Sequence, residues 1–386
     1  MAWLQLVLAG LFFGWALLAV FQAPIGSLWE PAIAATEWGH LLGLLSLTVL
    51  AIPGWRERPG QVGVALALLA FVLFLSPLVR ARSVAAKLPA QVEEAFGSTP
   101  PRSLPQAPPR AQPLAFADLL GLGALPELQV TPHVYRQEPV ALSLDLYLRA
   151  EGPRPAPVVI QIHGGSWSGG DNTQLPGINR YLAARGYAVA AINYRLVPEF
   201  TFPAPLDDVR AAIAWVKAEG SALGLDPERI VLMGRSAGGH LALVAGYDRP
   251  DPSVRGVVAY YPPTDMVWSW EHPADPWVYD SHGVLKAFLK GDPSTQPEIY
   301  EASSPLEFTT AKSAPTLLVH GGRDELVFEA QSERLAKRLT ELGVANLHLS
   351  LPWASHGCDA NMAGPTGQLS VYAIERFLAA VTSPGS

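Results

Sequence analysis

The segment of the chain with the most specific chemistry is residues 234–238, which read Gly-Arg-Ser-Ala-Gly. It lies between an apolar run typical of a strand, residues 229–233, and an apolar run typical of a helix, residues 241–245. A serine between two glycines at such a junction makes a sharp turn that lifts the hydroxyl above a sheet, at a helix N-terminus. Ser236 is therefore the candidate nucleophile. Because G-x-S-x-G also occurs by chance around an ordinary turn serine, the assignment depends on further residues.

A general base and a carboxylate follow farther along the chain. A serine hydroxyl is a weak nucleophile at neutral pH, so it needs a base, and the base needs a carboxylate that fixes its tautomer. His356 and Asp324 fit these roles, because each lies in a loop just past an apolar run suited to a strand, residues 347–351 and 316–319 respectively. The sequence thus predicts a triad in the order Ser236, acid, base.

Three other acidic residues lie near these motifs. Asp265 follows the apolar run 257–261 and is the alternative carboxylate for the base. Glu325 and Glu329 are interpreted as solvated residues at the start of a helix.

A glycine pair precedes the nucleophile along the chain. Residues 157–162 read as a buried strand, and this strand ends in His-Gly-Gly-Ser-Trp at residues 163–167. Backbone N–H groups at such a pair can point towards an oxyanion as it forms.

Several ordered motifs together resemble a known family. They are residues 163–167 (HGGSW), 193–199 (NYRLVPE), 202–208 (FPAPLDD), 234–238, 320–324 (HGGRD) and 356–357 (HG). From about residue 128 to residue 380, the chain resembles α/β-hydrolases of the hormone-sensitive-lipase and bacterial feruloyl-esterase-like group of carboxylesterases.

The resemblance implies hydrolysis of carboxylic esters through an acyl-enzyme, without a cofactor. It places the oxyanion donors on the backbone N–H groups of Gly165, Ser166 and Ala237. Ser166 stands where the family's HGGG loop has its third glycine, so its side chain is expected to narrow the acyl pocket. Acyl transfer and amide hydrolysis by the same triad are alternatives. A catalytically silent binding domain on a membrane stalk is a further alternative.

An aromatic insertion separates the strands expected near residues 257 and 316. It contains Trp268, Trp270 and Trp277, which with Trp167 form the predicted substrate pocket. An aromatic lid over the serine favours a hydrophobic acyl or aryl group in a small-molecule or lipid-like ester. The alternative is that these tryptophans only fasten the loop to the sheet.

The second half of the chain has the pattern of an α/β domain. Short apolar runs typical of covered parallel strands alternate with amphipathic helical stretches. The expected strands are residues 188–193, 230–233, 256–259, 316–319 and 347–351, and the expected helices are 205–219, 329–342 and 367–380. We therefore expect a mostly parallel, doubly wound sheet with its site at the carboxyl ends of the strands.

The N-terminal part of the chain is strongly apolar. Ala2–Ala23, Leu41–Trp55 and Gln61–Val79 are runs without a charged side chain, and the middle run lengthens if residues 31–40 are included. About three transmembrane helices are predicted within residues 1–82, which would make the protein an integral membrane protein in contact with lipids. The basic residues on the two sides do not decide the orientation.

A proline-rich segment connects the two parts. Residues 83–115 are predicted to be a semi-rigid, extended linker, although residues 83–96 also suit a helix that continues from the third apolar run. Residues 116–386 are predicted to be the catalytic domain, and we expect it to fold and act without the apolar segments.

Composition excludes some functions. The net charge of −7 gives no basic footprint for nucleic acid. The histidines and carboxylates lack the HExxH spacing of a metal site, so no metal is expected. The single cysteine, Cys358, can form no disulfide within the chain.

Overall fold

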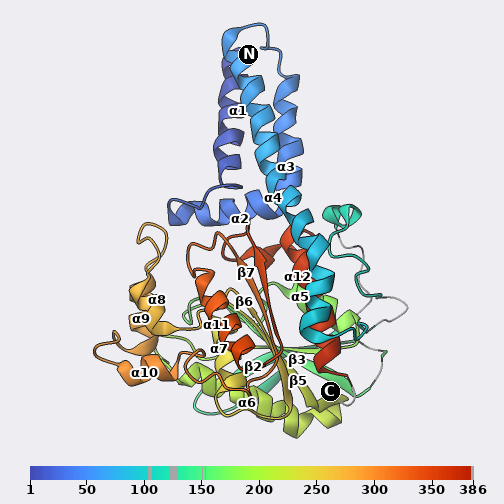
Figure 1. The fold of residues 1–386 in the computed structure, drawn as a ribbon, viewed down its shortest axis with the longest axis vertical. Helices are drawn as coiled ribbons and strands as arrows, with labels where there is room; N and C mark the ends of the chain where they lie inside the picture. Colours follow the sequence, from blue (N-terminus) through green and yellow to red (C-terminus); the bar gives the residue numbers. More distant parts are fainter. Residues whose placement is uncertain (103–106, 122, 124–127, 150, 153, 384–386) are drawn as a thin grey trace.

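A computed structural model describes residues 1–102, 107–121, 123, 128–149, 151–152 and 154–383. A domain built on one sheet carries a stalk of helices on one side, and the N-terminus lies in the stalk (Figure 1). Residues 103–106 of the predicted linker lie outside the described part of the chain.

One eight-stranded sheet forms the centre of the domain, in the order β1-β2-β4-β3-β5-β6-β7-β8. The strands are β1 (Leu128–Arg136), β2 (Leu142–Arg149), β3 (Ala156–Ile162), β4 (Ala188–Ile192), β5 (Leu225–Arg235), β6 (Val254–Tyr260), β7 (Thr316–Gly321) and β8 (Asn346–Leu351). The pairs β1–β2 and β2–β4 are antiparallel, and the pairs from β4 across to β8 are parallel. The predicted α/β-hydrolase sheet is confirmed.

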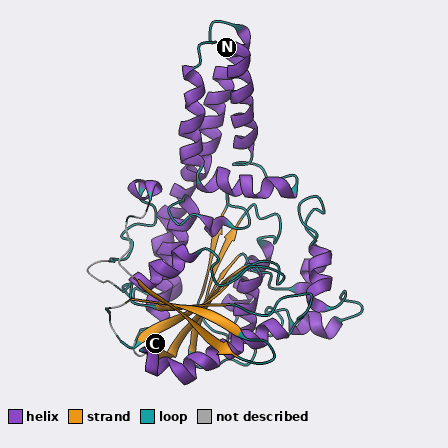
Figure 2. Cartoon of the chain, turned by 180° about the vertical axis from the view of Figure 1, so that it is seen from behind, coloured by secondary structure: helices purple, strands orange, loops and turns teal. Residues whose placement is uncertain are grey.

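Helices cover both faces of the sheet, which explains why its central strands are apolar throughout (Figure 2). α6 (Ala204–Glu219), α7 (Ala237–Tyr247) and α11 (Ala330–Glu341) pack on one face. α5 (Pro176–Ala184) and α12 (Pro365–Val381) pack on the other. The insertion between β6 and β7 folds as α8 (Met266–Glu271), α9 (Ser281–Leu289) and α10 (Pro297–Ala302). Short 3-10 turns are η3 (Phe116–Leu120), η4 (Gly220–Leu223) and η5 (Cys358–Ala360).

The stalk consists of α1 (Ala2–Leu17), α3 (Gly39–Ser46) with η2 (Leu47–Ala51), and the long α4 (Arg58–Phe96). Small residues let these helices approach closely, and a Cβ at Gly39 would lie 2.3 Å from the carbonyl oxygen of Phe74. Between η1 (Gly26–Leu28) and the stalk, α2 (Trp29–Glu37) lies across the stalk base (Figure 1).

The structure reduces the expected number of straight membrane spans. Among the described helices, only α4 is long and apolar enough to cross a bilayer alone. α1 has 16 residues, and the pair Gly26–Glu37 and Gly39–Ala51 is bent by 88°. The middle run therefore does not extend through residues 31–40 as one helix, because α2 turns aside to lie on the catalytic domain.

Residues 83–96 are helical, not extended, because α4 continues to Phe96. Leu88 and Val92, one helical turn apart, are buried in the same apolar cluster as Phe377 of α12. The lower part of α4 therefore packs on the domain, and the stalk stands directly on the sheet domain instead of at the end of an extended tether.

Candidate active site

The turn between β5 and α7 has the geometry expected of a nucleophile elbow. Ser236 adopts φ 52° and ψ −121° and is the residue that precedes α7. A Cβ at Gly234 would lie 2.2 Å from the carbonyl oxygen of Gly238, and one at Gly238 would lie 2.3 Å from that of His163. Only glycine fits at either position, so the strained serine is held by the packing around it.

Ser236, His356 and Asp324 form one hydrogen-bonded chain. The Nε2 atom of His356 lies 2.9 Å from the Oγ atom of Ser236, and its Nδ1 atom lies 2.7 Å from Oδ2 of Asp324. The other carboxylate oxygen accepts hydrogen bonds from the backbone N–H groups of Leu326 and Val327. This is the arrangement that allows a histidine to take a proton from serine.

The carboxylate of the chain is buried and ionised. Burial by itself raises the pKa of Asp324, but the charge of His356 and hydrogen bonds from His320 and His356 outweigh it and lower the pKa to about 2. His320 lies behind the carboxylate, with its Nε2 atom 3.3 Å from Oδ2. Asp324 therefore stays charged across the pH range in which an enzyme works.

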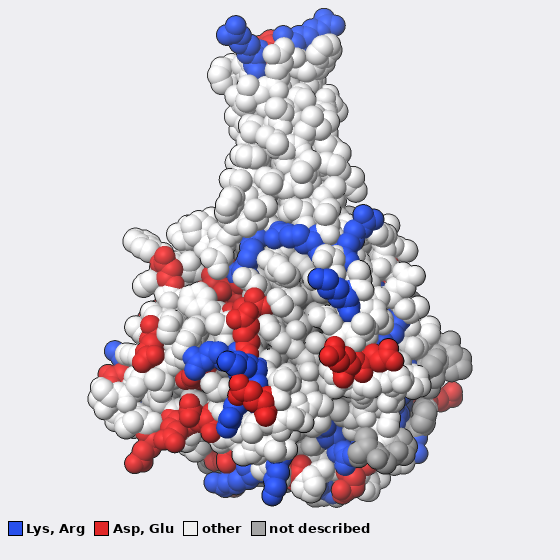
Figure 3. All heavy atoms as spheres, viewed as in Figure 1, with Lys and Arg blue, Asp and Glu red and all other residues white. Residues whose placement is uncertain are grey.

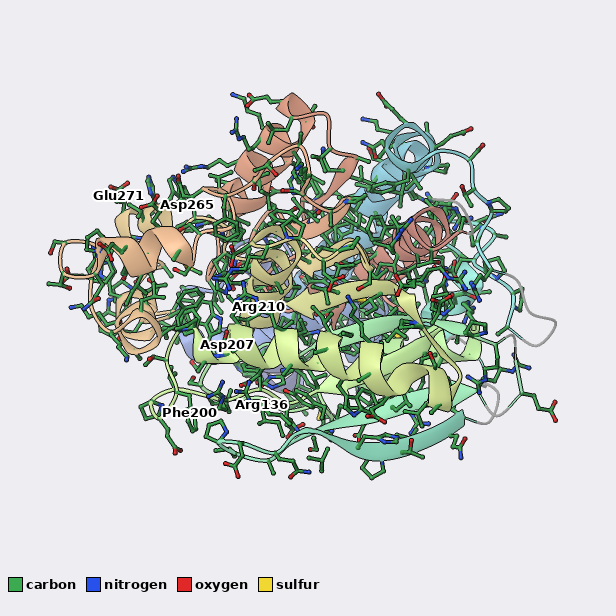
Figure 4. All side chains as sticks on the ribbon, turned by 90° about the horizontal axis from the view of Figure 1, so that it is seen from below. Arg136, Phe200, Asp207, Arg210, Asp265 and Glu271 are labelled. Atoms are coloured by element: carbon green, nitrogen blue, oxygen red, sulfur yellow. The ribbon has the colours of Figure 1, made fainter. Side chains whose placement is uncertain are left out.

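Asp265 has a structural role away from this chain. Its side chain accepts a hydrogen bond from the backbone N–H of Trp268 at the start of α8 and lies 2.7 Å from Nη2 of Arg334. In Figure 4 it lies beside Glu271, also of the insertion between β6 and β7. The structure thus brings Asp324, and not Asp265, to His356.

Of the two glutamates expected to be solvated at a helix start, Glu325 is buried and Glu329 is partly buried. Glu325 is only 5% exposed, and in the described structure neither of its carboxylate oxygens has a hydrogen-bond partner. Burial, and then the neighbouring charge of Asp324, raise the pKa of Glu325 to about 7. Glu329 is partly buried, 3.4 Å from Nε2 of His348. The expectation of solvation was therefore wrong for Glu325, and Glu329 lies beside His348 of β8.

The loop after β3 presents its backbone to the nucleophile. Gly165, Ser166 and Trp167 have φ values of 119°, 55° and 57°, which turn this backbone sharply. Within the described residues, the backbone N–H groups of Gly165, Ser166 and Ala237 donate no hydrogen bond. All three residues border a cavity that Ser236 also lines, so their N–H groups are available to an oxyanion there.

Two cavities meet at the nucleophile. One has a volume of about 50 Å³ and the other, a groove, of about 660 Å³; Ser236, Ser166 and Tyr279 line both. The apolar walls of the small cavity include Trp167, Trp268, Leu285, Val327 and Phe328.

Two of the four predicted pocket tryptophans lie elsewhere. Trp270 packs on His282, with ring centroids 4.1 Å apart, and lines neither cavity. Trp277 is 79% exposed and also lines neither cavity. Trp270 packs against the core of the domain, as the alternative interpretation of the aromatic loop expects, whereas the exposed Trp277 fits neither interpretation.

One wall of the large groove comes from the N-terminal segment, which sequence reasoning did not place in the site. Trp29, Ile33 and Ala34 of α2, together with Trp38, line the groove, which His356 also lines. One feature of the sequence could have indicated this placement: residues 26–38 interrupt the apolar runs and carry two tryptophans. Such a composition suits a helix at an interface.

The same segment contacts the loops that carry the base and the acid. The Nη2 atom of Arg323, the residue before Asp324, donates to the carbonyl oxygens of Leu18 and Phe21 at 2.7 and 2.6 Å. The amide nitrogen of Asn361 donates to the carbonyl of Glu37 at 3.0 Å. The expectation that the catalytic domain is independent of the apolar segments is therefore not supported by these contacts.

Comparisons with known proteins agree with this geometry. Residues 144–339 match the BD-FAE family, a range that includes Ser236 and Asp324 and ends before His356. Esterase LipC of Mycobacterium tuberculosis is 32% identical over 261 residues, which are 64% of this chain and 63% of the relative. Esterase LipQ of the same organism is 30% identical over 231 residues, which are 56% of this chain and 54% of the relative. The chain thus spans less than two thirds of the length of these curated relatives.

A solved structure shows the same fold. A bacterial heroin esterase superposes with a TM-score of 0.59 at 23% identity, over 69% of this chain and 89% of that chain. This similarity establishes the α/β-hydrolase fold.

Proposed function

The chain belongs to the BD-FAE family, and from this premise we propose that it is a membrane-anchored serine hydrolase that cleaves carboxylic esters. The observation that carries the proposal is the hydrogen-bonded chain from Ser236 through His356 to Asp324. The named esterases among its relatives support the same reaction class.

The proposed reaction uses each group according to its position. His356 takes the proton of the Ser236 hydroxyl as its oxygen attacks the ester carbonyl carbon, while Asp324 holds the imidazole and stabilises its charge. The N–H groups of Gly165, Ser166 and Ala237 bind the oxyanion. His356 then protonates the leaving alkoxide, and water, activated in the same way, releases the acid from the acyl-enzyme.

The length and the apolar surface of the stalk are the evidence for a membrane anchor. From Arg58 to Arg80, α4 rises about 33 Å without a charged residue in between, close to the roughly 30 Å thickness of a bilayer core. Outward side chains such as Val7 and Val72 are 57% and 61% exposed and apolar. Figure 3 shows a surface without charged side chains between the tip and base of the stalk. An apolar surface of this length suits lipid better than water.

Hydrolysis of short p-nitrophenyl esters by the full chain in detergent tests the proposal. We expect turnover and covalent labelling by a fluorophosphonate probe, both lost in Ser236→Ala. Absence of turnover and label in a folded protein would favour the silent binding domain. Turnover with acyl product appearing on a competing alcohol would indicate acyl transfer, and faster turnover of matched anilides than esters would indicate an amide hydrolase.

A further inference from the structure

The nucleophile stands at the boundary between two cavities of very different size. The small cavity of about 50 Å³ lies on the side of Trp167 and Ala237. The groove of about 660 Å³ lies on the side of α2. An ester bound with its carbonyl carbon at Ser236 must place its acyl group and its alcohol group in different cavities, because the two extend in different directions from that carbon.

The position of the base decides which cavity takes the alcohol. The leaving oxygen must receive its proton from the Nε2 atom of His356, so the alcohol must lie on the side where this ring is accessible. His356 lines the groove and does not line the small cavity. The alcohol therefore lies in the groove, and the acyl group lies in the small cavity.

The size of the small cavity limits the acyl group. Its volume of about 50 Å³ lies far below the roughly 300–1,000 Å³ of typical ligand sites, so the small cavity accepts only a short group. The hydroxyl of Ser166, 2.6 Å from that of Tyr279, contributes to the restriction. An acetyl to butyryl group fits this space, and a long acyl chain does not.

The groove, in contrast, is large. Its volume is within the range of sites that enclose ligands of several hundred daltons. The α2 wall presents Trp29 and Ile33 beside the acidic Glu30, Trp38 follows directly after the helix, and α2 joins the base of the apolar stalk (Figure 1). A long apolar alcohol chain bound in the groove would therefore lie beside the base of the stalk.

We propose that the substrate is a short-chain acyl ester of a long-chain, lipid-like alcohol, with the alcohol held between α2 and the catalytic domain. This inference rests on the proposed ester hydrolysis. It assigns part of the substrate site to the N-terminal segment and predicts that selectivity is set by which side of the ester is long.

Two isomeric esters test the proposal. Decyl acetate and ethyl decanoate have the same composition and nearly the same hydrophobicity, and differ in which side of the ester is long. We expect the full chain in mixed micelles to hydrolyse decyl acetate with a kcat/KM at least about 10-fold higher. Equal values, or a preference for ethyl decanoate, would overturn the proposal while leaving the hydrolase function intact. No turnover of either ester and no fluorophosphonate label would instead mean that the proposed function is wrong.

A groove-filling variant tests the role of α2. Ile33→Trp should lower the ratio of kcat/KM for decyl acetate to that for ethyl acetate at least about 5-fold, because the long alcohol loses its space. Val72→Trp, on the exposed surface of the stalk, is the matched control and should keep the wild-type ratio. An unchanged ratio in a folded Ile33→Trp protein would contradict the assignment of the groove. If this variant does not fold, the isomer pair on the wild-type chain still decides the proposal.

Discussion

The indole nitrogen of Trp29 donates a hydrogen bond of 3.0 Å to the backbone carbonyl oxygen of His356, across 327 positions of sequence. The indole ring also lies 6.2 Å from the imidazole ring, centroid to centroid. On the acid side, Arg323 binds the carbonyls at the end of α1. The N-terminal segment thus supports both loops of the triad, and the stalk base and the active site form one structural unit.

Trp29→Phe should lower kcat by up to about 5-fold, because one hydrogen bond that positions the base is worth about 1 kcal/mol. The KM of a short ester should change less, since the phenyl ring still closes the groove. Trp55→Phe, at an exposed position in the turn before α4, is the control. Steady-state kinetics with p-nitrophenyl acetate measure both variants, and a wild-type kcat for Trp29→Phe would contradict a positioning role.

Removal of residues 1–113 should lower the stability and the activity of the catalytic domain. A chain that begins at Leu114 leaves the α12 face without Leu88 and Val92, and the base loop without Trp29. We expect a lower melting temperature and a kcat/KM at least about 10-fold below that of the full chain. A chain that begins at Arg58 separates the contribution of α4 from that of α2, because it contains α4 and lacks α2. If the Leu114 chain equals the full chain in both measurements, the contacts at the stalk base are dispensable.

Replacing the two candidate acids, Asp324 and Asp265, should have unequal effects on kcat. Ser236→Ala should lower kcat by about 10⁴ or more, and Asp324→Asn should cost nearly as much, because the amide favours the wrong tautomer of His356. Asp265→Asn should stay near the wild-type rate, since Asp265 only caps α8 and pairs with Arg334. A dead Asp265→Asn beside an active Asp324→Asn would reverse the assignment.

The sequence predicted the sheet and the position of the triad because both depend on local patterns. Residues that directly follow parallel strands meet at one edge of the sheet, so Asp324 and His356 could be brought to Ser236 without coordinates. The place of α2 depends on the long-range contact between Trp29 and His356, and the tryptophans of residues 26–38 indicate an interface without showing which surface it covers. For the same reason the burial of Glu325 was missed, since an acidic residue in a loop has the composition of a solvated one.

The buried Glu325 makes stability depend on pH. Its ordinary pKa of 4.5 is raised to about 7 in the fold, so between these values the folded chain binds more protons than the unfolded chain. The free energy of unfolding therefore falls as pH rises through this window, by up to about 3 kcal/mol. Below about pH 4.5 the group is protonated in both states and contributes no slope.

Glu325→Gln removes this ionisable group and keeps its shape. Its melting temperature should exceed that of the wild type by an amount that grows from about pH 5 to about pH 8. Glu333→Gln, at an exposed position on α11, is the control. Thermal unfolding followed by circular dichroism measures the difference, and a gap that stays constant with pH would mean that Glu325 does not ionise in this window.

Ser166→Gly should widen the acyl side of the site. Ser166 has a left-handed φ of 55°, which glycine adopts more easily, so the backbone of the loop should be retained. Removing its side chain enlarges the small cavity and releases the hydroxyl of Tyr279. The ratio of kcat/KM for hexanoate to that for acetate should rise, by up to about 4-fold for each methylene accommodated, because burial of a methylene is worth about 0.8 kcal/mol.

Tyr279→Phe is the control for Ser166→Gly. It removes the same hydrogen bond without the same gain in space, so its ratio of kcat/KM should rise less. A wild-type preference for acyl chains of ten carbons or more, unaffected by Ser166→Gly, would show that the acyl group does not bind in the small cavity.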